Sequence, residues 1–385
     1  MRVDQHPLEI SLHQAQQAVQ AQSWLEAWSI LEKINPDYYP DSRHLGALRE
    51  DFELIAATCM RHRGQFEAAD KLYTNLQSRL SLRDERLADA LLGRAECAHA
   101  VGNVPHARML MKAAERVPMT STVLALRVFT AGAHIASHVN IDEALDRFEW
   151  IDRNFPERED SSRANFEFWY ADALLVAGRF KDCIPRLVSA HRLAVATSAT
   201  ITTADAIRRL PLARVLCGQT DYALRGLGDL NQASQLYKLA GDRGAAYVHT
   251  EAGETYRAIG KLREAERAFS HGVWESRNIQ DENREAHNQI GLFEVGRMAG
   301  NIQLDLLITA EKLYNKYGSD WGLVQVQISR ALADLSNQAE HIKVARELIS
   351  SSRFSRFERE LEILSWIETA KSEELATYPH LMNYP

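Results

Sequence analysis

Two histidines four positions apart, His134 and His138, are the side chains whose type and spacing best suit metal binding. Residues four apart share one face of a helix, and zinc accepts neutral imidazole as a ligand. The metalloprotease glutamate is absent between them, and no third ligand lies nearby in sequence. Cys97, His99 and His106 form a second loose group with the same shortfall. The sequence therefore predicts no metal site and no cofactor.

A Gly-Lys pair in residues 252–272, "AGETYRAIGKLREAERAFSHG", raises the question of phosphate binding. A phosphate-binding loop needs four residues between its glycines and a Ser or Thr directly after the lysine. Six residues separate Gly253 from Gly260, and Leu262 follows Lys261. We therefore interpret Gly260 as a hinge between two helices.

No other stretch has the pattern of a known catalytic motif. A nucleophile elbow, a dinucleotide-binding loop and a kinase set are all absent from the sequence. A net charge of −7 argues against nucleic-acid binding, which usually requires a basic face. The sequence therefore predicts a protein that is not an enzyme.

The location of the protein is predicted from segments that the sequence lacks. The N-terminus has no signal or transit character, and no apolar run is long enough to span a bilayer. Four cysteines occur without any CxxC pair, which is typical of buried free thiols in a reducing compartment. We expect a cytoplasmic protein without a membrane partner.

The elements that position these side chains are predicted to be helices throughout. Ala, Leu, Glu, Arg and Gln dominate the composition, and apolar residues recur at intervals of three and four. The hinge at Gly260 has a small residue seven before it, a large one four before, alanine five after and an aromatic nine after. The same register centres on further positions, namely Gln22, Gly64, Gly102, Val139, Gly178, Gly228 and Gly300.

This register resembles the tetratricopeptide repeat, and its best copy is Gly253, Tyr256, Gly260, Ala265 and Phe269. The resemblance implies a right-handed α-solenoid of about eight or nine helical hairpins over residues 8–350. Most hinge intervals exceed the usual 34 residues, as in long-helix variants of the family. The 50-residue interval before position 228 suggests a looped insertion at 197–206, where Ser and Thr accumulate. Residues 351–385 are expected to form a capping helix and a short tail.

The resemblance also implies that the first helix of each hairpin lines a concave groove. Positions three and six before the later hinges give alternating cations and polar partners, namely Arg225, Arg257, Arg297, Tyr222, Glu254 and Glu294. One interpretation is that the Glu–Arg combinations are ordinary surface pairs three residues apart. The other is that the arginines bind carboxylates or carbonyl groups of an extended peptide. The sequence leaves both open.

The predicted function is a non-catalytic scaffold that binds a protein or peptide in its groove. One alternative is a peptide-sensing regulator resembling bacterial quorum-peptide receptors, although the repeats are expected to begin by residue 10, without a preceding effector domain. Another alternative is the regulatory subunit of an enzyme complex. Self-association is compatible with all three.

Overall fold

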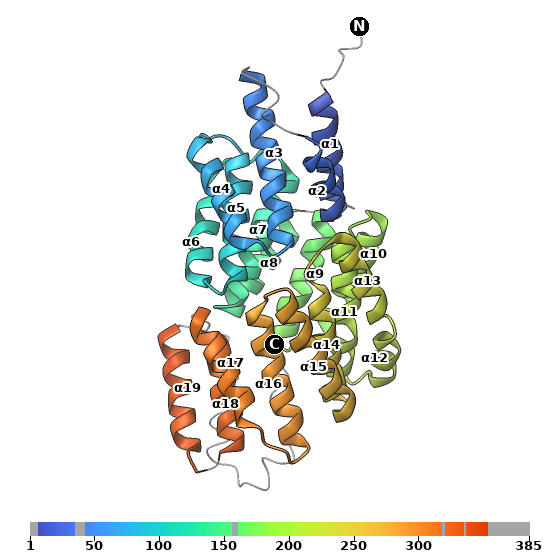
Figure 1. Ribbon diagram of the computed structural model, residues 1–385, viewed down its shortest axis with the longest axis vertical. Helices are drawn as coiled ribbons and strands as arrows, with labels where there is room; N and C mark the ends of the chain where they lie inside the picture. Colours follow the sequence, from blue (N-terminus) through green and yellow to red (C-terminus); the bar gives the residue numbers. More distant parts are fainter. Residues whose placement is uncertain (1–6, 35–42, 156–160, 318–319, 335, 353–385) are drawn as a thin grey trace.

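The computed structural model describes residues 7–34, 43–155, 161–317, 320–334 and 336–352, and their helices pack as antiparallel hairpins (Figure 1). The first four hairpins are α1 (Pro7–Gln20) with α2 (Trp24–Glu32), α3 (Arg43–His62) with α4 (Phe66–Arg79), α5 (Arg86–Ala100) with α6 (Val104–Ala114), and α7 (Thr122–Ser137) with α8 (Ile141–Asn154). No strand occurs in these described ranges. The predicted all-α solenoid is confirmed.

Five more hairpins complete the described part of the stack. They are α9 (Ser161–Val176) with α10 (Phe180–Ala196), α11 (Thr200–Leu216) with α12 (Thr220–Leu227) and α13 (Leu230–Ala240), α14 (Ala245–Ala258) with α15 (Leu262–Asn278), α16 (Glu282–Met298) with α17 (Leu304–Tyr317), and α18 (Asp320–Ala333) with α19 (Gln338–Ser352). A capping helix and tail are predicted over 351–385; residues 351 and 352 belong to α19, and the rest of this stretch lies outside the described residues.

The hinge at Gly260 has the backbone conformation that favours glycine. Its φ is +76°, and the N–H groups of Gly260 and Lys261 donate to carbonyl oxygens of α14 at 3.0 and 2.9 Å. A Cβ at this position would have open space around it. Glycine is therefore favoured here by the left-handed backbone alone, and the interpretation as a hinge is confirmed.

The predicted hinge at Gly228 is wrong. Gly228 has a φ of −63° and ends α12, whereas Gly218, with a φ of +79°, makes the turn from α11 into α12. Hinges at 178, 218 and 260 are 40 and 42 residues apart, so the irregular intervals disappear. The register was misplaced because the second helix of this hairpin breaks into α12 and α13, and Ala233 and Tyr237 of α13 fit the repeat pattern.

The predicted insertion at 197–206 is also wrong. Residues 200–206 form the first two turns of α11, and Ile201, Thr202 and Ala204 are buried. Residues 197–199 form only the short turn between α10 and α11, with Ser198 at a φ of +55°. Thr202 is hydrogen-bonded to Gln22 inside the molecule.

Aromatic side chains of the second helices lock successive hairpins together. Phe269 of α15 packs against Gly253 of its own hairpin and Gly291 of the next, and a Cβ at either glycine would approach its ring to 2.7 or 2.5 Å. The same contact joins other neighbours, namely Tyr73 with Gly93, Tyr237 with Gly244, and Tyr314 with Gly322. At these four junctions, a glycine in or just before the following first helix makes room for the aromatic ring.

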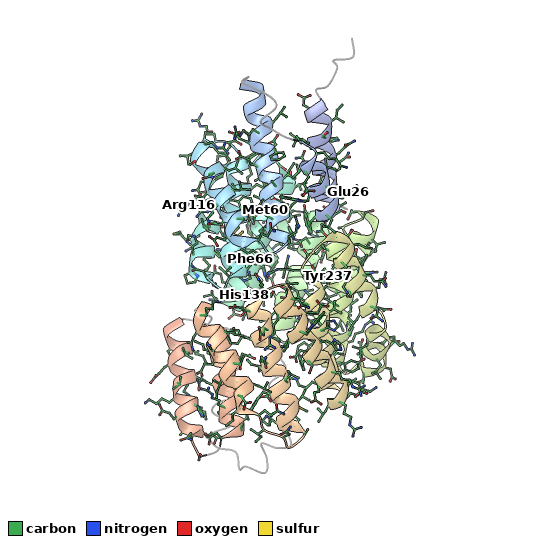
Figure 2. All side chains as sticks on the ribbon, in the orientation of Figure 1. Glu26, Met60, Phe66, Arg116, His138 and Tyr237 are labelled. Carbon is green, nitrogen blue, oxygen red and sulfur yellow. The ribbon has the colours of Figure 1, made fainter. Side chains whose placement is uncertain are left out.

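The superhelix closes on itself where the first hairpin meets the sixth. Trp24 of α2 is buried in one apolar cluster with Tyr237 of α13, and the Gln22 side chain hydrogen-bonds Thr202 of α11 at 3.0 Å. Figure 1 shows α1 and α2 reaching the helices α10 to α13, and Figure 2 shows side chains filling the space between these groups. The concave side is consequently bounded by helices far apart in the sequence.

The turn between α13 and α14 also contacts the first hairpins. Asp242 accepts a hydrogen bond at 3.1 Å from His62 of α3, whose ring stacks on Trp24 at 3.7 Å between ring centroids. The Arg243 guanidinium lies 4.5 Å above the Phe66 ring centroid. We call this contact the closure junction; it is formed by Gln22, Trp24, His62, Phe66, Asp242 and Arg243.

Candidate binding face of the solenoid

The first helices of the hairpins contact one another in series and form an inner layer. α9 touches α11, α11 touches α14, and α14 touches α16. Helices that stay in contact along a curved stack lie on its shorter, concave radius. Most of the buried charged side chains belong to this layer, so it is the polar face of the solenoid.

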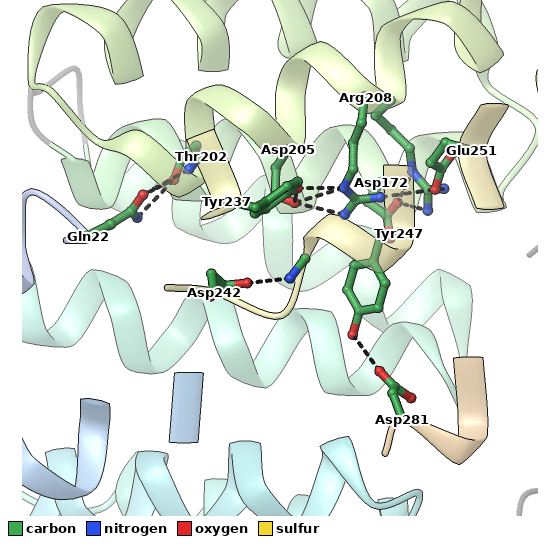
Figure 3. Close-up of polar contacts among 12 residues, drawn as sticks. Gln22, Asp172, Thr202, Asp205, Arg208, Tyr237, Asp242, Tyr247, Glu251 and Asp281 are labelled. Carbon is green, nitrogen blue, oxygen red and sulfur yellow. Dashed lines mark hydrogen bonds and ion pairs between the residues drawn. The ribbon is translucent and has the colours of Figure 1, made fainter. Parts of the chain in front are cut away.

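An arginine–carboxylate network lies at the centre of this layer, where α9, α11 and α14 meet (Figure 3). The Arg209 guanidinium binds Asp172 of α9 and donates at 2.5 Å to Glu251 of α14. Arg208 donates to the same Glu251 oxygen at 3.0 Å. Two arginines from α11 thus hold one carboxylate of each neighbouring first helix.

The same network extends to the second helix layer through Tyr237. Arg208 donates at 2.8 Å to the Tyr237 hydroxyl, which donates at 2.6 Å to Asp205. Arg208 also pairs with Asp205 at 2.8 Å. Because every guanidinium here faces a carboxylate, the desolvation of each charge is offset by an opposite charge.

The pKa values of this network follow from burial and pairing together. Burial alone would raise the pKa of Asp172, but the adjacent Arg209 outweighs it and lowers that pKa below its ordinary value. Burial opposes the charge of Arg209 as well, yet Asp172 and Glu251 raise its pKa. The arginines and Asp172 are therefore charged at neutral pH, and the arrangement behaves as a permanent ionic cluster.

Four of the predicted groove residues fall on the next two first helices. Arg257 binds Glu254 at 2.5 Å within α14, and Arg297 binds Glu294 at 2.8 Å within α16. His287 of α16 lies 3.6 Å from Glu254. The pairs three residues apart are present, but Glu254, Arg257 and Glu294 are buried rather than on an open surface.

The remaining two predicted groove residues lie elsewhere. Tyr222 and Arg225 belong to α12, a second helix at the edge of the molecule in Figure 1, and both are exposed. The Arg225 guanidinium stands 5.7 Å from the centroid of its neighbour Tyr222. The misplaced hinge at Gly228 explains why these two were assigned to a first helix.

The electrostatics at Glu254 show how strongly the paired charges interact. Burial would raise its pKa, but Arg257 and then His287 lower the pKa to about 2. The carboxylate is therefore ionised throughout the neutral range.

Three buried oxygen atoms of the inner layer keep an unused capacity to accept hydrogen bonds. Glu251 Oε2, Glu294 Oε1 and Gln289 Oε1 have no hydrogen-bond partner among the described residues. A buried acceptor without a partner costs about 1–3 kcal/mol. A hydrogen-bond donor that reaches these oxygens on α14 and α16 would remove this cost and gain binding free energy.

A histidine cluster lies in the earlier part of the same layer. His99 of α5 faces His134 of α7 and His138, which directly follows α7, with ring centroids 4.5 to 5.2 Å apart. The third ligand that the sequence did not place beside His134 and His138 is thus His99, from the preceding hairpin. Burial lowers the pKa of His99 to about 3 and of His134 to about 4, so both rings are neutral at pH 7.

The cysteines have the predicted character of buried thiols. Cys59, Cys97 and Cys183 are buried, Cys217 is partly buried, and all four are free. Burial raises the pKa of Cys59, Cys97 and Cys183 to about 12. These three thiols are protonated at neutral pH and are poor nucleophiles.

The hairpins and their repeated framework define the protein as a tetratricopeptide-like α-solenoid. A solved Rap protein complexed with competence and sporulation factor resembles it with a TM-score of 0.63 and 15% identity, covering 96% of this chain and 98% of that chain. The apo form of RapI gives a TM-score of 0.52 and 10% identity, covering 91% and 99%. At these identities the likeness shows the fold.

Sequence comparison adds no further relationship. No protein-family model matches the chain, and no curated protein matches it. None of the described helices is long and apolar enough to cross a membrane.

Proposed function

We propose that the protein is a non-catalytic receptor that binds an extended peptide or protein segment against α14 and α16 on its concave face. The observation that supports this most directly is the pair of unpartnered carboxylate oxygens, Glu251 Oε2 and Glu294 Oε1. Each carboxylate is fixed by an arginine through its other oxygen. The two acceptors are therefore held rigidly while still lacking donors.

The chemistry of these acceptors specifies the kind of ligand. Carboxylate oxygens accept hydrogen bonds from backbone N–H groups and from ammonium or guanidinium groups, and such charge-assisted bonds are the strong ones. An extended segment offers donors at regular intervals and can reach two adjacent first helices. The ligand we infer is thus a peptide segment that donates hydrogen bonds, with basic side chains favoured over acidic ones.

The arginines have a supporting role in this proposal. Arg257 and Arg297 are engaged by Glu254 and Glu294, so they orient carboxylates more readily than they bind a ligand carboxylate. Arg225 and Tyr222 stand on the outer helix α12 and are proposed to lie outside the binding face. The proposed groove is therefore defined by Glu251 and Glu294.

A selection experiment tests the receptor function. A phage-displayed library of random peptides is selected on the full-length protein, and an enriched peptide is synthesised and titrated by calorimetry. We expect Glu251→Gln and Glu294→Gln each to weaken binding about 10- to 100-fold, because a hydrogen bond to a charged group contributes about 1.5–3 kcal/mol. The matched control is Glu266→Gln, at an exposed glutamate on α15, which should leave the affinity unchanged.

Two outcomes would overturn the proposal. One is that selection enriches no peptide above the level obtained with an unrelated protein. The other is that enriched peptides bind Glu251→Gln, Glu294→Gln and Glu266→Gln with equal affinity.

A second candidate is a regulator that changes shape when it binds. The fold it shares with a Rap protein complexed with competence and sporulation factor, and with the apo form of RapI, favours this variant of the proposal. The closure junction is the contact whose opening or tightening would alter the superhelix. Small-angle scattering with and without the selected peptide checks it: a change in the radius of gyration favours a regulator, and an unchanged radius favours a rigid scaffold.

A further inference from the structure

Three imidazoles converge on the concave side at a point separate from Glu251 and Glu294. His99, His134 and His138 each offer one ring nitrogen, and these atoms lie within 4.8 Å of one another. They come from two successive first-helix segments, α5 and the end of α7. We refer to these three residues as the histidine triad.

The ring types and their environment suit a transition metal ion. Imidazole nitrogen is a preferred ligand for Zn²⁺, Cu²⁺ and Ni²⁺, whereas Mg²⁺ and Ca²⁺ prefer oxygen ligands. Two of the rings, His99 and His134, have no hydrogen bond to another described side chain, so metal binding at these rings would displace no protein partner. Trp169 packs on His134 with 3.8 Å between ring centroids and restricts the tilt of that ring.

The spacing is compatible with coordination after small side-chain rotations. Nitrogen ligands of a tetrahedral zinc ion at about 2.0–2.1 Å from the metal stand about 3.3 Å apart. The separations in the triad reach 4.8 Å at most. Small rotations of the histidine side chains would cover this difference without moving the helices, because all three residues are only partly buried.

The charges around the triad nearly cancel. Arg243 acts on His99, and Asp172 and Arg209 act on His134. Asp172 and Arg209 pair with each other, and Arg243 pairs with Asp281 at 3.2 Å. No strong positive field therefore opposes a divalent cation.

We propose that the histidine triad binds one divalent transition metal ion of the zinc class, coordinated by His99, His134 and His138. Three protein ligands leave a fourth coordination position open, which water or a donor group of a bound partner fills. The ion would join the third and fourth hairpins across their inner layer. This inference is independent of the peptide site, since the triad shares no residue with it.

Calorimetric titration with Zn²⁺ tests the proposal on the full-length protein after dialysis against a chelator. We expect one Zn²⁺ ion per chain. Each of His99→Ala, His134→Ala and His138→Ala should weaken binding by more than about 100-fold, because loss of an outer partner of a metal ligand already costs 10- to 100-fold. Mg²⁺ in place of Zn²⁺ should give no saturable heat.

A second pair of histidines supplies the matched control. His249 and His271 stack with 5.5 Å between ring centroids and belong to no three-ligand group in the described chain. His249→Ala and His271→Ala should therefore leave zinc affinity unchanged. Circular dichroism confirms that each variant folds, and His138→Gln, at the end of α7, replaces any triad variant that does not.

The proposal is overturned by either of two results. One is a wild-type protein that binds no zinc at a ratio near one ion per chain. The other is zinc binding that survives in the folded triad variants or that falls equally in the His249 and His271 variants.

Discussion

The inner layer contains two polar regions built on opposite principles. In the arginine–carboxylate network, Arg208 and Arg209 face Asp172, Asp205 and Glu251, so every guanidinium has carboxylate partners. In the histidine triad, imidazole rings face one another. The network pairs two guanidinium groups with three carboxyl groups and binds α9, α11 and α14 together. The triad brings one ring nitrogen from each of three histidines within 4.8 Å of one another.

The comparison teaches that burial and pairing must be considered together. A buried polar side chain whose partners are all supplied by the protein is part of the framework. A cluster of ligand-type atoms from neighbouring hairpins, or a carboxylate held through one oxygen while the other lacks a partner, is a candidate for binding. The first principle describes Arg209, and the second describes His99 and Glu251.

The largest decrease in the free energy of unfolding is expected from removing a charge in the arginine–carboxylate network. Arg209→Met leaves Asp172 without its arginine and Glu251 with Arg208 alone, and breaking a buried ion pair in this way costs about 3–5 kcal/mol. The free energy of unfolding in urea measures it. Arg267→Met, at an exposed position of α15, should change it by less than about 0.5 kcal/mol. Equal effects of both variants would contradict the structural role of the network.

A slightly smaller loss of the free energy of unfolding is expected when the pH is lowered. The pKa of Glu254 is lowered to about 2 in the folded protein from 4.5, mainly by Arg257 and then by the contact with His287. The resulting stabilisation, about 3 kcal/mol at most, is complete above pH 4.5 and is lost as the pH falls towards 2. Urea unfolding at several pH values should therefore show a shallower acid dependence for Glu254→Gln than for wild type. Parallel profiles would refute this account of Glu254.

The histidine triad should respond to metal where the network does not. At a free zinc concentration 100-fold above the dissociation constant, one site raises the free energy of unfolding by about 2.7 kcal/mol. We expect that increase in wild type and in none of the triad variants, measured by urea unfolding with and without zinc. His134→Ala in the absence of zinc should cost far less than Arg209→Met. A zinc-independent loss as large as that of Arg209→Met would erase the distinction between the two regions.

The smallest effect is expected on the outer helix. Arg225 is exposed on α12 and rests beside Tyr222. Arg225→Ala should change the free energy of unfolding by less than about 0.5 kcal/mol and leave the affinity for a selected peptide unaltered. A tenfold loss of peptide affinity in Arg225→Ala would instead show that α12 is part of the binding face.

The repeat framework was predictable because its positions depend on local rules. A glycine with positive φ at Gly260 and a buried Phe269 follow from hinge geometry and helical spacing. Pairing of Glu254 with Arg257 follows from their separation by three residues. What local spacing does not give is burial, which depends on how neighbouring hairpins cover the side chains.

The central network was missed because α11 has no apolar stripe to reveal it. Its adjacent arginines, Arg208 and Arg209, lie inside a helix that is buried on most sides, and the preceding Ser/Thr-rich residues were interpreted as a loop. The available signal was the pair of adjacent arginines in the middle of this helix, with Asp205 three residues before Arg208. Their partners Asp172 and Glu251 lie 37 and 42 residues away, beyond what spacing within one helix predicts.

The histidine triad was half visible in the sequence. His134 and His138 were recognised as sharing a face, and His99 was noted in a separate group. Placing His99 beside them requires the register between α5 and α7, which follows from hairpin stacking. The closure junction was invisible for a stronger reason, since Gln22 and Thr202 are 180 residues apart.

Anomalous X-ray diffraction at the zinc absorption edge, from crystals grown with one equivalent of zinc per chain, tests both sides of the comparison at once. The account predicts a single strong anomalous peak within bonding distance of His99, His134 and His138. It also predicts that Arg209 still binds Asp172 and Glu251 in the same crystal. Absence of a peak at the triad, or a zinc ion at Glu251 in place of Arg209, would contradict it.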